Sequence, residues 1–353
     1  MSRPIQARIN LEALSENLSR VRSYAPNSKV LSVIKANAYG HGLIRAAGAL
    51  VASDGFALLD LEDAVKLRQA GFDQKIVLLE GCFSGDELHA ASRYSIDIVV
   101  HCVEQIDMLE QAKLERKMGI FAKCNTGMNR LGFRPSEFQA AISRLEKNAN
   151  VSGIVLMTHF CCADGNEGVD GQMDVFRKFK LNHPRSLANS AALIRYPGTR
   201  GEWVRPGIML YGSSPFAEKS AEELGLKPVM TLSSRIIAVQ AIRAGDGVGY
   251  GPMFRAEKDM RIGIVACGYA DGFPRHAPNG TPVLVQGRKS ETVGRVSMDM
   301  LMVDISDIRD AGIGSDVVLW GEGNPVEQVA QACGTISYEL LCAISPRVPV
   351  SYS

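Results

Sequence analysis

The sequence feature that most constrains the fold is a regular alternation of short apolar runs and amphipathic segments, from about residue 29 to about residue 211. β-Branched and other apolar residues dominate each run, which is typical of buried strands. The predicted strands are VLSVIK (30–35), GFALLD (55–60), KIVLLE (75–80), IDIVV (96–100), GIFAKC (119–124), GIVLMTH (153–159), SLAN (186–189) and VRPGIMLYG (204–212). Helical patterns with charged faces lie between them, for example DLEDAVKLRQAG (60–71), VEQIDMLEQAKLER (103–116), PSEFQAAISRLEK (135–147) and GQMDVFRKFKLN (171–182).

Eight β–α units in strict alternation predict a parallel sheet, and that number fits a closed (β/α)8 barrel of the TIM type. An open doubly wound sheet is the structural alternative, and it usually carries a G-x-G-x-x-G turn after its first strand. The chain has neither that turn nor a phosphate-binding G-x-x-x-x-G-K-[ST] segment, so we favour the barrel.

The pattern changes after about residue 226, where strands are separated by Gly, Pro and Asp turns instead of helices. These strands are TLSSRIIAVQAI (231–242), RIGIVACGY (261–269), TPVLVQG (281–287), ETVGRVSMDMLMVDI (291–305) and DVVLW (316–320), and a helix at 325–334 follows them. We therefore predict an α/β protein with a barrel over residues 1–225 and a mostly antiparallel β domain over residues 226–353. A first strand at about residues 4–10 is a candidate member of that β domain.

The composition excludes several classes of function. Lys+Arg 39 against Asp+Glu 38 leaves a net charge of +1 with no long run of like charge, so we expect no nucleic-acid partner. No segment has the length of a membrane span and the N-terminus has no apolar signal-peptide core, so we expect a cytoplasmic protein without a membrane partner. The 8 cysteines include no C-x-x-C pair and the 6 histidines supply no clustered ligand spacing, so we expect free thiols and no metal.

Residues that can do chemistry fall at the ends of the predicted barrel strands, where barrel enzymes place their active sites. They are Lys35 and Tyr39 after the first strand, Lys123 and Arg130 after the fifth, His159 at the end of the sixth, Asn189 and Ser190 after the seventh, and Arg205 and Gly207 in the eighth. Each of them alone has a structural explanation, such as a surface ion pair or a core histidine. Their gathering at one rim favours an active site, and a lysine that ends an apolar strand is rarely buried without a partner or a chemical use.

Seven segments resemble the signature segments of the alanine racemase family, whose members use pyridoxal 5′-phosphate. The segments are SVIKANAYGHG (32–42), KCNTGMNRLGF (123–133), LMTHF (156–160), ANSAA (188–192), VRPGIMLYG (204–212), VGYG (248–251) and GYADGF (268–273). The resemblance covers essentially the whole chain, including the β domain. It implies a homodimer that interconverts L-alanine and D-alanine, either to supply D-alanine for peptidoglycan or to degrade it.

The chemistry of racemisation agrees with this resemblance. Removal of a Cα proton needs an electron sink, and pyridoxal phosphate held as a Schiff base on a lysine supplies one. Lys35 suits that role because desolvation at the end of an apolar strand disfavours its ammonium form. Proton exchange on both faces needs two bases, and the resemblance implies Lys35 for one face and Tyr250, from the partner subunit, for the other. It also implies that His159 hydrogen-bonds to Tyr250 and that Arg205 supports His159.

The resemblance assigns the remaining site residues as well. The implied cofactor contacts are Lys35, Tyr39, Arg130, His159, Asn189, Ser190, Arg205, Gly207 and Ile208; the implied substrate contacts are Arg130, Met298 and Tyr250; the implied supporting residues are His159, Tyr269, Asp299 and Lys123. Many family members carry a carbamylated lysine at the position of Lys123, and we expect that modification here, where it would orient Arg130. Pro346 stands where some relatives have a tyrosine that touches the phosphate, and proline cannot donate that bond.

Arg205 has a further implied role. An arginine only donates hydrogen bonds, so beside the pyridine nitrogen it would leave that nitrogen unprotonated. The cofactor would then be a weaker electron sink, which should limit side reactions such as transamination.

Two alternatives remain open from the sequence. Another pyridoxal-phosphate barrel enzyme, such as an amino-acid decarboxylase or a broader racemase, would share the barrel and the lysine. A cofactor carrier would resemble the barrel alone. Tyr250 together with His159 favours racemisation over both.

Overall fold

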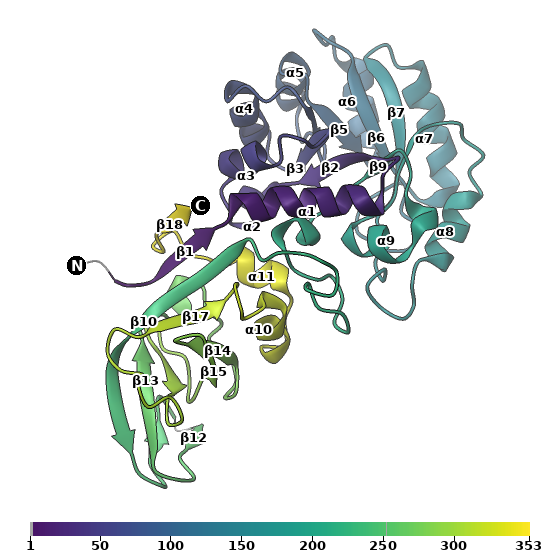
Figure 1. Cartoon of the computed structure of the whole chain (residues 1–353). Helices are drawn as coiled ribbons and strands as arrows, with labels where there is room; N and C mark the ends of the chain where they lie inside the picture. Colours follow the sequence, from purple (N-terminus) through teal and green to yellow (C-terminus); the bar gives the residue numbers. More distant parts are fainter. Residues whose placement is uncertain (1–2, 252) are drawn as a thin grey trace. The chain divides into compact units, whose positions relative to one another are not determined.

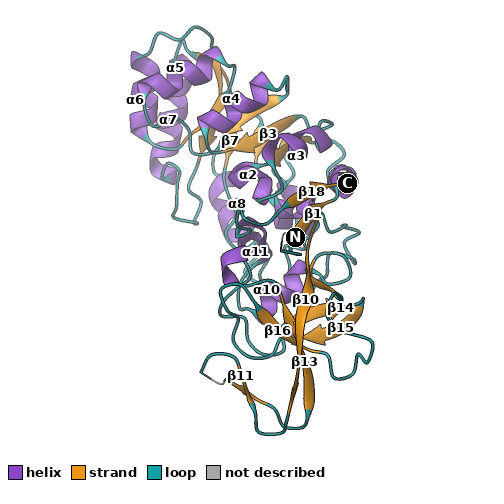
Figure 2. Ribbon diagram, turned by 90° about the vertical axis from the view of Figure 1, so that its left-hand side faces the viewer, coloured by secondary structure: helices purple, strands orange, loops and turns teal. Residues whose placement is uncertain are grey.

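The computed structural model describes residues 3–251 and 253–353 and divides into two compact units (Figures 1 and 2). The barrel unit contains Ser15–Ala38 and Gly42–Leu210. Of the described residues, the β unit contains 3–14, Tyr39–His41, 211–251 and 253–353. The short segment Tyr39–His41 therefore belongs to the β unit, although barrel residues flank it on both sides.

The barrel unit is a closed ring of eight parallel strands. In order around the ring, these strands are β2 (Lys29–Val33), β3 (Gly55–Leu58), β4 (Lys75–Leu78), β5 (Asp97–Val100), β6 (Met118–Lys123), β7 (Val151–Met157), β8 (Arg185–Ser186) and β9 (Trp203–Val204). Pairing of β9 with β2, at Val204 opposite Val30, closes the ring. The predicted barrel is confirmed.

Amphipathic helices follow the strands of this unit (Figure 1). They are α3 (Leu43–Ala49), α4 (Leu61–Gln69), α5 (Gly85–Arg93), α6 (Val103–Gln111), α7 (Pro135–Lys147), α8 (Asp170–Arg177) and α9 (Ser190–Arg195), with a 3-10 turn η1 (Pro197–Thr199); α1 (Leu11–Tyr24) precedes β2. Helix α7 illustrates why these segments are helical. Proline occupies its first turn, where no N–H is needed, and Phe138, Ala141, Ile142 and Leu145 bury one stripe.

The last two barrel strands are shorter than the sequence predicted. The expected strand over 204–212 is wrong beyond Val204, because Pro206 has no N–H for a ladder and Ile208–Tyr211 forms a 3-10 turn, η2. Likewise the expected strand 186–189 ends at Ser186, because Asn189 caps α9: its side chain accepts a 3.0 Å hydrogen bond from Ala192 N. These early endings leave irregular backbone at the barrel rim.

The β unit is built on a mixed sheet in the order β15-β14-β17-β10-β1-β18, with β13 paired to β10 and β16 paired to β13. Its strands are β1 (Gln6–Ile9), β10 (Met230–Ile242), β13 (Met260–Val265), β14 (Pro282–Val285), β15 (Arg288–Glu291), β16 (Leu301–Asp304), β17 (Asp316–Trp320) and β18 (Val350–Tyr352). Only β1 and β18 pair in parallel, so the expected mostly antiparallel sheet is confirmed. A separate hairpin joins β11 (Gly247–Val248) to β12 (Phe254–Arg255), and the unit also contains α10 (Val326–Ala332), α11 (Ser337–Cys342) and the 3-10 turn η3 (Tyr269–Asp271).

Candidate active site

The chain makes a left-handed turn directly after Lys35. Segment α2 (Lys35–Tyr39) has φ values of 52° to 53° at Ala36, Asn37, Ala38 and Tyr39, none of which is glycine. Each such residue costs roughly 1–2 kcal/mol, so a run of four is held by its surroundings. Ala38 N donates to Ile34 O over 3.0 Å, and the Asn37 side chain accepts a 2.8 Å bond from Leu43 N. The turn therefore fixes the backbone at Lys35 against a strong local preference.

Lys123 is the deeply buried lysine of the barrel rim, whereas Lys35 is only half-buried. We expected desolvation chiefly at Lys35. Burial, together with the positive charges of Arg205 and Arg130, lowers the pKa of Lys123 to about 8. The Glu80 carboxylate opposes this shift only in part. Lys123 is consequently an amine that is partly neutral near physiological pH.

Arg205 is buried at the end of β9 and has no carboxylate partner among the described residues. Its guanidinium donates to backbone oxygens of Ser186 (2.5 Å), Thr158 (2.7 Å) and Leu187 (3.3 Å), and to the Ser186 hydroxyl (2.8 Å). Burial lowers its pKa to about 10, so it remains charged at neutral pH. The arginine is a fixed cation held by neutral groups.

His159 lies among these cations just after β7. Burial lowers its pKa to about 3, and Arg205, Lys123 and Arg130 all act in the same direction. The imidazole is therefore neutral at physiological pH. A neutral imidazole has one donor and one acceptor nitrogen, so it can serve another group as a hydrogen-bond donor.

Ser190 and Gly207 meet where the loops after β8 and β9 approach each other. The Gly207 N–H donates to the Ser190 hydroxyl oxygen over 2.9 Å, and both residues are buried. The hydroxyl proton of Ser190 remains available to another acceptor, because only its oxygen is used in that bond. Ile208 follows at once in η2 and is also buried.

Tyr39 is buried within the β unit. Its ring stacks on Tyr211 at 4.5 Å between centroids and lies 5.8 Å from the ring of Tyr338. Burial, with Tyr338 and Cys342 nearby, raises the pKa of Tyr39 well above its usual range. The phenol therefore stays protonated and acts as a donor.

Tyr250, Tyr269, Met298 and Asp299 all lie in the β unit. Three of them are unusually exposed for their type: Tyr250 69%, Met298 52% and Tyr269 38%. Tyr250 follows Gly249, which adopts a φ of +74° and packs so closely on Met302 and Arg295 that a side chain would collide. The hairpin thus presents the Tyr250 ring outward from a constrained backbone.

The structure gathers the predicted residues in two groups. The barrel unit brings together Lys35, Lys123, Arg130, His159, Asn189, Ser190, Arg205, Gly207 and Ile208; the β unit holds Tyr39, Tyr250, Tyr269, Met298 and Asp299. Each unit therefore holds one of the two groups.

The sequence analysis missed Glu80, His101 and Gln172. Glu80 O accepts hydrogen bonds from His101 Nε2 (3.1 Å) and Gln105 Nε2 (2.9 Å), and the Glu80 carboxylate is the acidic group that acts on Lys123. Glu80 and His101 directly follow β4 and β5, so the strand-end rule that selected Lys35 would also have found them.

Gln172, on α8, connects two rim loops. Its Nε2 donates to Thr126 Oγ1 (2.9 Å) and His159 O (3.0 Å), and its Oε1 accepts from Cys161 N (2.9 Å). Nothing in its sequence surroundings signals this role.

Other kinds of site have no support in the described part of the chain. No group of three or more His, Cys, Asp or Glu residues there could hold a metal ion. All eight cysteines are free thiols. In residues 3–251 and 253–353, no helix combines the length and apolarity that crossing a membrane requires.

The fold and the rim define a class of protein: a (β/α)8-barrel enzyme with a strongly cationic mouth and an added β unit. Two family descriptions match the chain, "Alanine racemase, N-terminal domain" over residues 9–215 and "Alanine racemase, C-terminal domain" over residues 229–352. Alanine racemase of Nitrosospira multiformis is 58% identical and that of Nitrosomonas europaea 56% identical, with 99% of this chain covered in both and 99% and 98% of the relatives. The crystal structure of biosynthetic alanine racemase from Pseudomonas aeruginosa is similar with a TM-score of 0.97 and 45% identity over 99% of each chain.

The chain belongs to the alanine racemase family. It is an isomerase that interconverts L-alanine and D-alanine, and the family to which it belongs uses pyridoxal phosphate.

Proposed function

We propose that the barrel mouth binds pyridoxal 5′-phosphate, and the charge balance of the rim is the observation that carries this proposal. Among the described residues, the side chains of Lys35, Lys123 and Arg130 have no ion-pair or hydrogen-bond partner, Arg205 is bonded only to neutral groups, and the Glu80 carboxylate offsets the cations around Lys123 only in part. Uncompensated cations in a partly buried site favour an anionic ligand. A phosphorylated cofactor and an amino-acid carboxylate meet that requirement, so the residues fit the cofactor.

Several residues of the chain would hold the cofactor, each at a different part. Lys35 would attach the cofactor covalently, Arg205 would donate toward its ring nitrogen, Arg130 and His159 would help to hold its ring, and Tyr39, Asn189, Ser190, Gly207 and Ile208 would hold its phosphate. When bound, the cofactor would withdraw electrons from the substrate and so make the Cα proton acidic. Because Arg205 only donates hydrogen bonds, it would leave the ring nitrogen unprotonated and so limit this withdrawal.

Two residues move the proton at Cα. The Lys35 amine takes or returns it on one face, and the Tyr250 hydroxyl does so on the other. Neutral His159 supports Tyr250 because its N–H can stabilise a phenolate. L-Alanine and D-alanine have equal free energies, so their concentrations set the direction of the reaction.

Arg130 and the backbone N–H of Met298 hold the substrate carboxylate. In the described part of the chain, the Met298 N–H donates no hydrogen bond, so it is available to a ligand. A carbamate on Lys123 would add a negative charge beside Arg130 and orient its guanidinium.

The active site is shared between two subunits of a homodimer in this proposal, with Tyr250 serving the partner's Lys35. Its support is the number of large side chains with apolar surface that the β unit exposes, among them Tyr250, Met253, Tyr269, Met298 and Met300. Large exposed apolar surface marks an interaction site. The free thiols further support a cytoplasmic location, since disulfides are rare there.

Complementation between inactive subunits tests the shared site. Lys35→Ala and Tyr250→Phe should each abolish racemisation. Coexpression in equal amounts should give a heterodimer with one intact site, which restores roughly a quarter of the activity when heterodimers make up half of the population. If each site used its own subunit's Tyr250, the mixture would stay inactive.

Deuterium exchange tests the two bases separately. Wild-type holoenzyme with L-alanine in heavy water should form D-alanine with deuterium at Cα. Tyr250→Phe should still exchange deuterium, with retention, into the enantiomer whose Cα proton faces Lys35, so L-alanine and D-alanine are each used as substrate, and it should form almost none of the opposite enantiomer. If Tyr250→Phe racemises normally, the role given to Tyr250 is wrong.

A further inference from the structure

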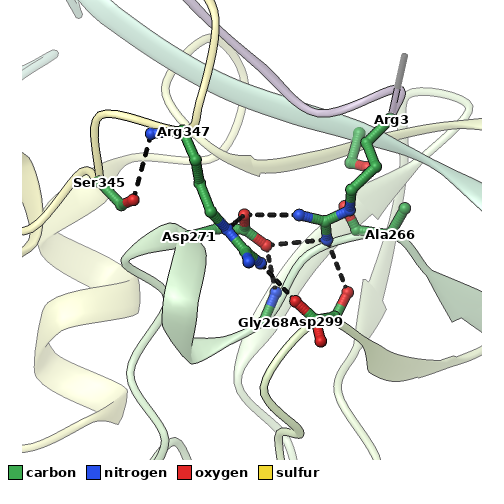
Figure 3. Close-up of polar contacts among 8 residues, drawn as sticks. Arg3, Ala266, Gly268, Asp271, Asp299, Ser345 and Arg347 are labelled. Atoms are coloured by element: carbon green, nitrogen blue, oxygen red, sulfur yellow. Dashed lines mark hydrogen bonds and ion pairs between the residues drawn. The ribbon is translucent and has the colours of Figure 1, made fainter.

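A charge cluster surrounds one buried carboxylate in the β unit, and it includes none of the barrel rim residues. The carboxylate of Asp271 is fully buried and accepts four hydrogen bonds: from Arg3 Nη1 (2.8 Å) and Nη2 (3.0 Å), from Arg347 Nε (2.7 Å) and from Gly268 N (2.9 Å) (Figure 3). Burial alone would raise the pKa of Asp271, but these hydrogen bonds hold it below its usual value. Asp271 is therefore a permanent anion.

Asp299 completes the cluster. Arg347 Nη2 donates to Asp299 Oδ1 over 2.6 Å, and Arg3 Nη2 donates to the backbone oxygen of Asp299 over 2.8 Å (Figure 3). Two cations and two anions thus balance one another. Each arginine spans both Asp271 and Asp299, which a point charge such as a lysine ammonium does less well.

The cluster ties together two turns, one with the predicted substrate contact Met298 and the other with the predicted supporting residue Tyr269. Turn η3 begins at Tyr269, whose N–H donates to Ser297 O over 3.0 Å, and Ala270 N donates to Met298 O over 3.0 Å. The contact is so close that a Cβ at Gly268 would lie 2.3 Å from Ser297 O. Asp271 anchors the first turn and Asp299 the second.

We propose that Arg3, Asp271 and Arg347 are positioning residues that fix the Met298 N–H for the substrate carboxylate. This inference rests on the proposed function, in which the Met298 N–H holds that carboxylate. The side chains of Met298 and Tyr269 are exposed, whereas the backbone of their two turns is hydrogen-bonded. The cluster therefore orders two surface turns. An isolated surface ion pair contributes little to stability, but this network differs because its central carboxylate is buried.

Tyr250 is held by a different part of the β unit. Its hairpin packs through Val248 on a small apolar core with Ile262, Val293 and Met302. Disturbing the charge cluster should therefore impair carboxylate binding more than proton transfer by Tyr250. In steady-state kinetics that difference appears as a raised KM for alanine with a nearly unchanged kcat.

The variants Arg3→Met and Arg347→Met test this separation in the holoenzyme, with Arg288→Met as the matched control. Arg288 forms an exposed pair with Asp310 (2.8 Å) in the same unit. Each test variant should raise the alanine KM about tenfold and change kcat less than about twofold, while the control changes neither. Propionate, an unreactive carboxylate, should lose affinity by the same factor when its binding is measured by calorimetry. Arg347→Lys should recover part of the loss and replaces Arg347→Met if that variant is insoluble.

Two results would overturn the inference: an unchanged KM and propionate affinity in variants that remain dimeric, or a loss of kcat without a change in KM. A failure of the proposed function would look different, because the Lys35→Ala and Tyr250→Phe subunits would then not complement each other, although neither carries a change in the charge cluster.

Discussion

Nη2 of Arg205 lies 3.5 Å from Nδ1 of His159. An arginine has no acceptor, so in this contact Nδ1 must be the unprotonated nitrogen of the imidazole. The proton of neutral His159 then sits on Nε2. Burial is the main reason that the imidazole is neutral, and this fixed cation adds to that effect and sets the tautomer, so that Nε2–H is available for the proposed hydrogen bond to Tyr250.

The first prediction concerns the acid stability conferred by His159. Its pKa is about 3 in the folded chain and about 6.5 when unfolded, so between these values only the unfolded chain binds the proton. The free energy of unfolding should therefore fall by up to roughly 1.4 kcal/mol per pH unit as pH drops below about 6.5. In urea unfolding of the cofactor-free protein, His159→Gln should remove this dependence, and an equally steep fall in the variant would contradict the assignment.

The second prediction concerns the reaction specificity set by Arg205. The variant Arg205→Glu should allow protonation of the pyridine nitrogen and so favour transamination. Pyruvate formed per racemisation event should rise at least about tenfold, as expected when a buried charge of opposite sign changes the proton affinity by more than a pKa unit. Arg205→Lys retains the charge and serves as the control. A pyruvate yield equal to that of wild type would show that Arg205 does not limit the side reaction.

The third prediction concerns the chemical state of Lys123. Because its pKa is about 8, a large fraction of the amine is neutral at pH 8 and can add CO2, releasing a proton and forming a carbamate. Protein equilibrated with 13C-bicarbonate at pH 8.5 should give one carbamate resonance, and that signal should weaken as the pH is lowered toward 6. Lys123→Met should lack it, and a wild-type spectrum without the resonance would exclude the modification.

The fourth prediction concerns the left-handed turn at α2. Ala36 is exposed with a φ of 52°, so Ala36→Gly relieves strain without loss of packing. Its effect on the free energy of unfolding should lie between about 0 and 1 kcal/mol of stabilisation, while Ala36→Val should destabilise by about 1 kcal/mol or more. Thermal unfolding measures both. A lower kcat in the more flexible glycine variant is expected, because Lys35 would be less firmly placed.

The barrel could be predicted from the sequence because its strands are continuous apolar runs and its helices are amphipathic. The prediction was wrong where the strand ladder ends early, at Asn189, which caps α9, and at Pro206, which has no N–H for the ladder. The left-handed turn could not be predicted, since Ala and Asn do not by themselves prefer that conformation and only the surrounding fold imposes it.

The burial of individual side chains and the pairing of distant residues could not be predicted from the sequence either. The strand pattern treated Lys35 and Lys123 alike, but burial distinguishes them. The pairing of Arg3 with Asp271 joins residues 268 positions apart, and no local pattern indicates it. Motif resemblance supplied Tyr250, whose own surroundings read as an ordinary turn.

The pairing of β1 with both β10 and β18 has a consequence for how the chain is synthesised. The strands of the barrel lie between Lys29 and Val204, so the barrel can close while translation continues. Strand β1 is synthesised before the barrel, yet its partners emerge more than two hundred residues later, and until then its edge N–H and C=O groups are open to chaperones or to misassociation. Completion of this sheet thus follows synthesis of the whole barrel, and any assembly that depends on the β unit must wait for it.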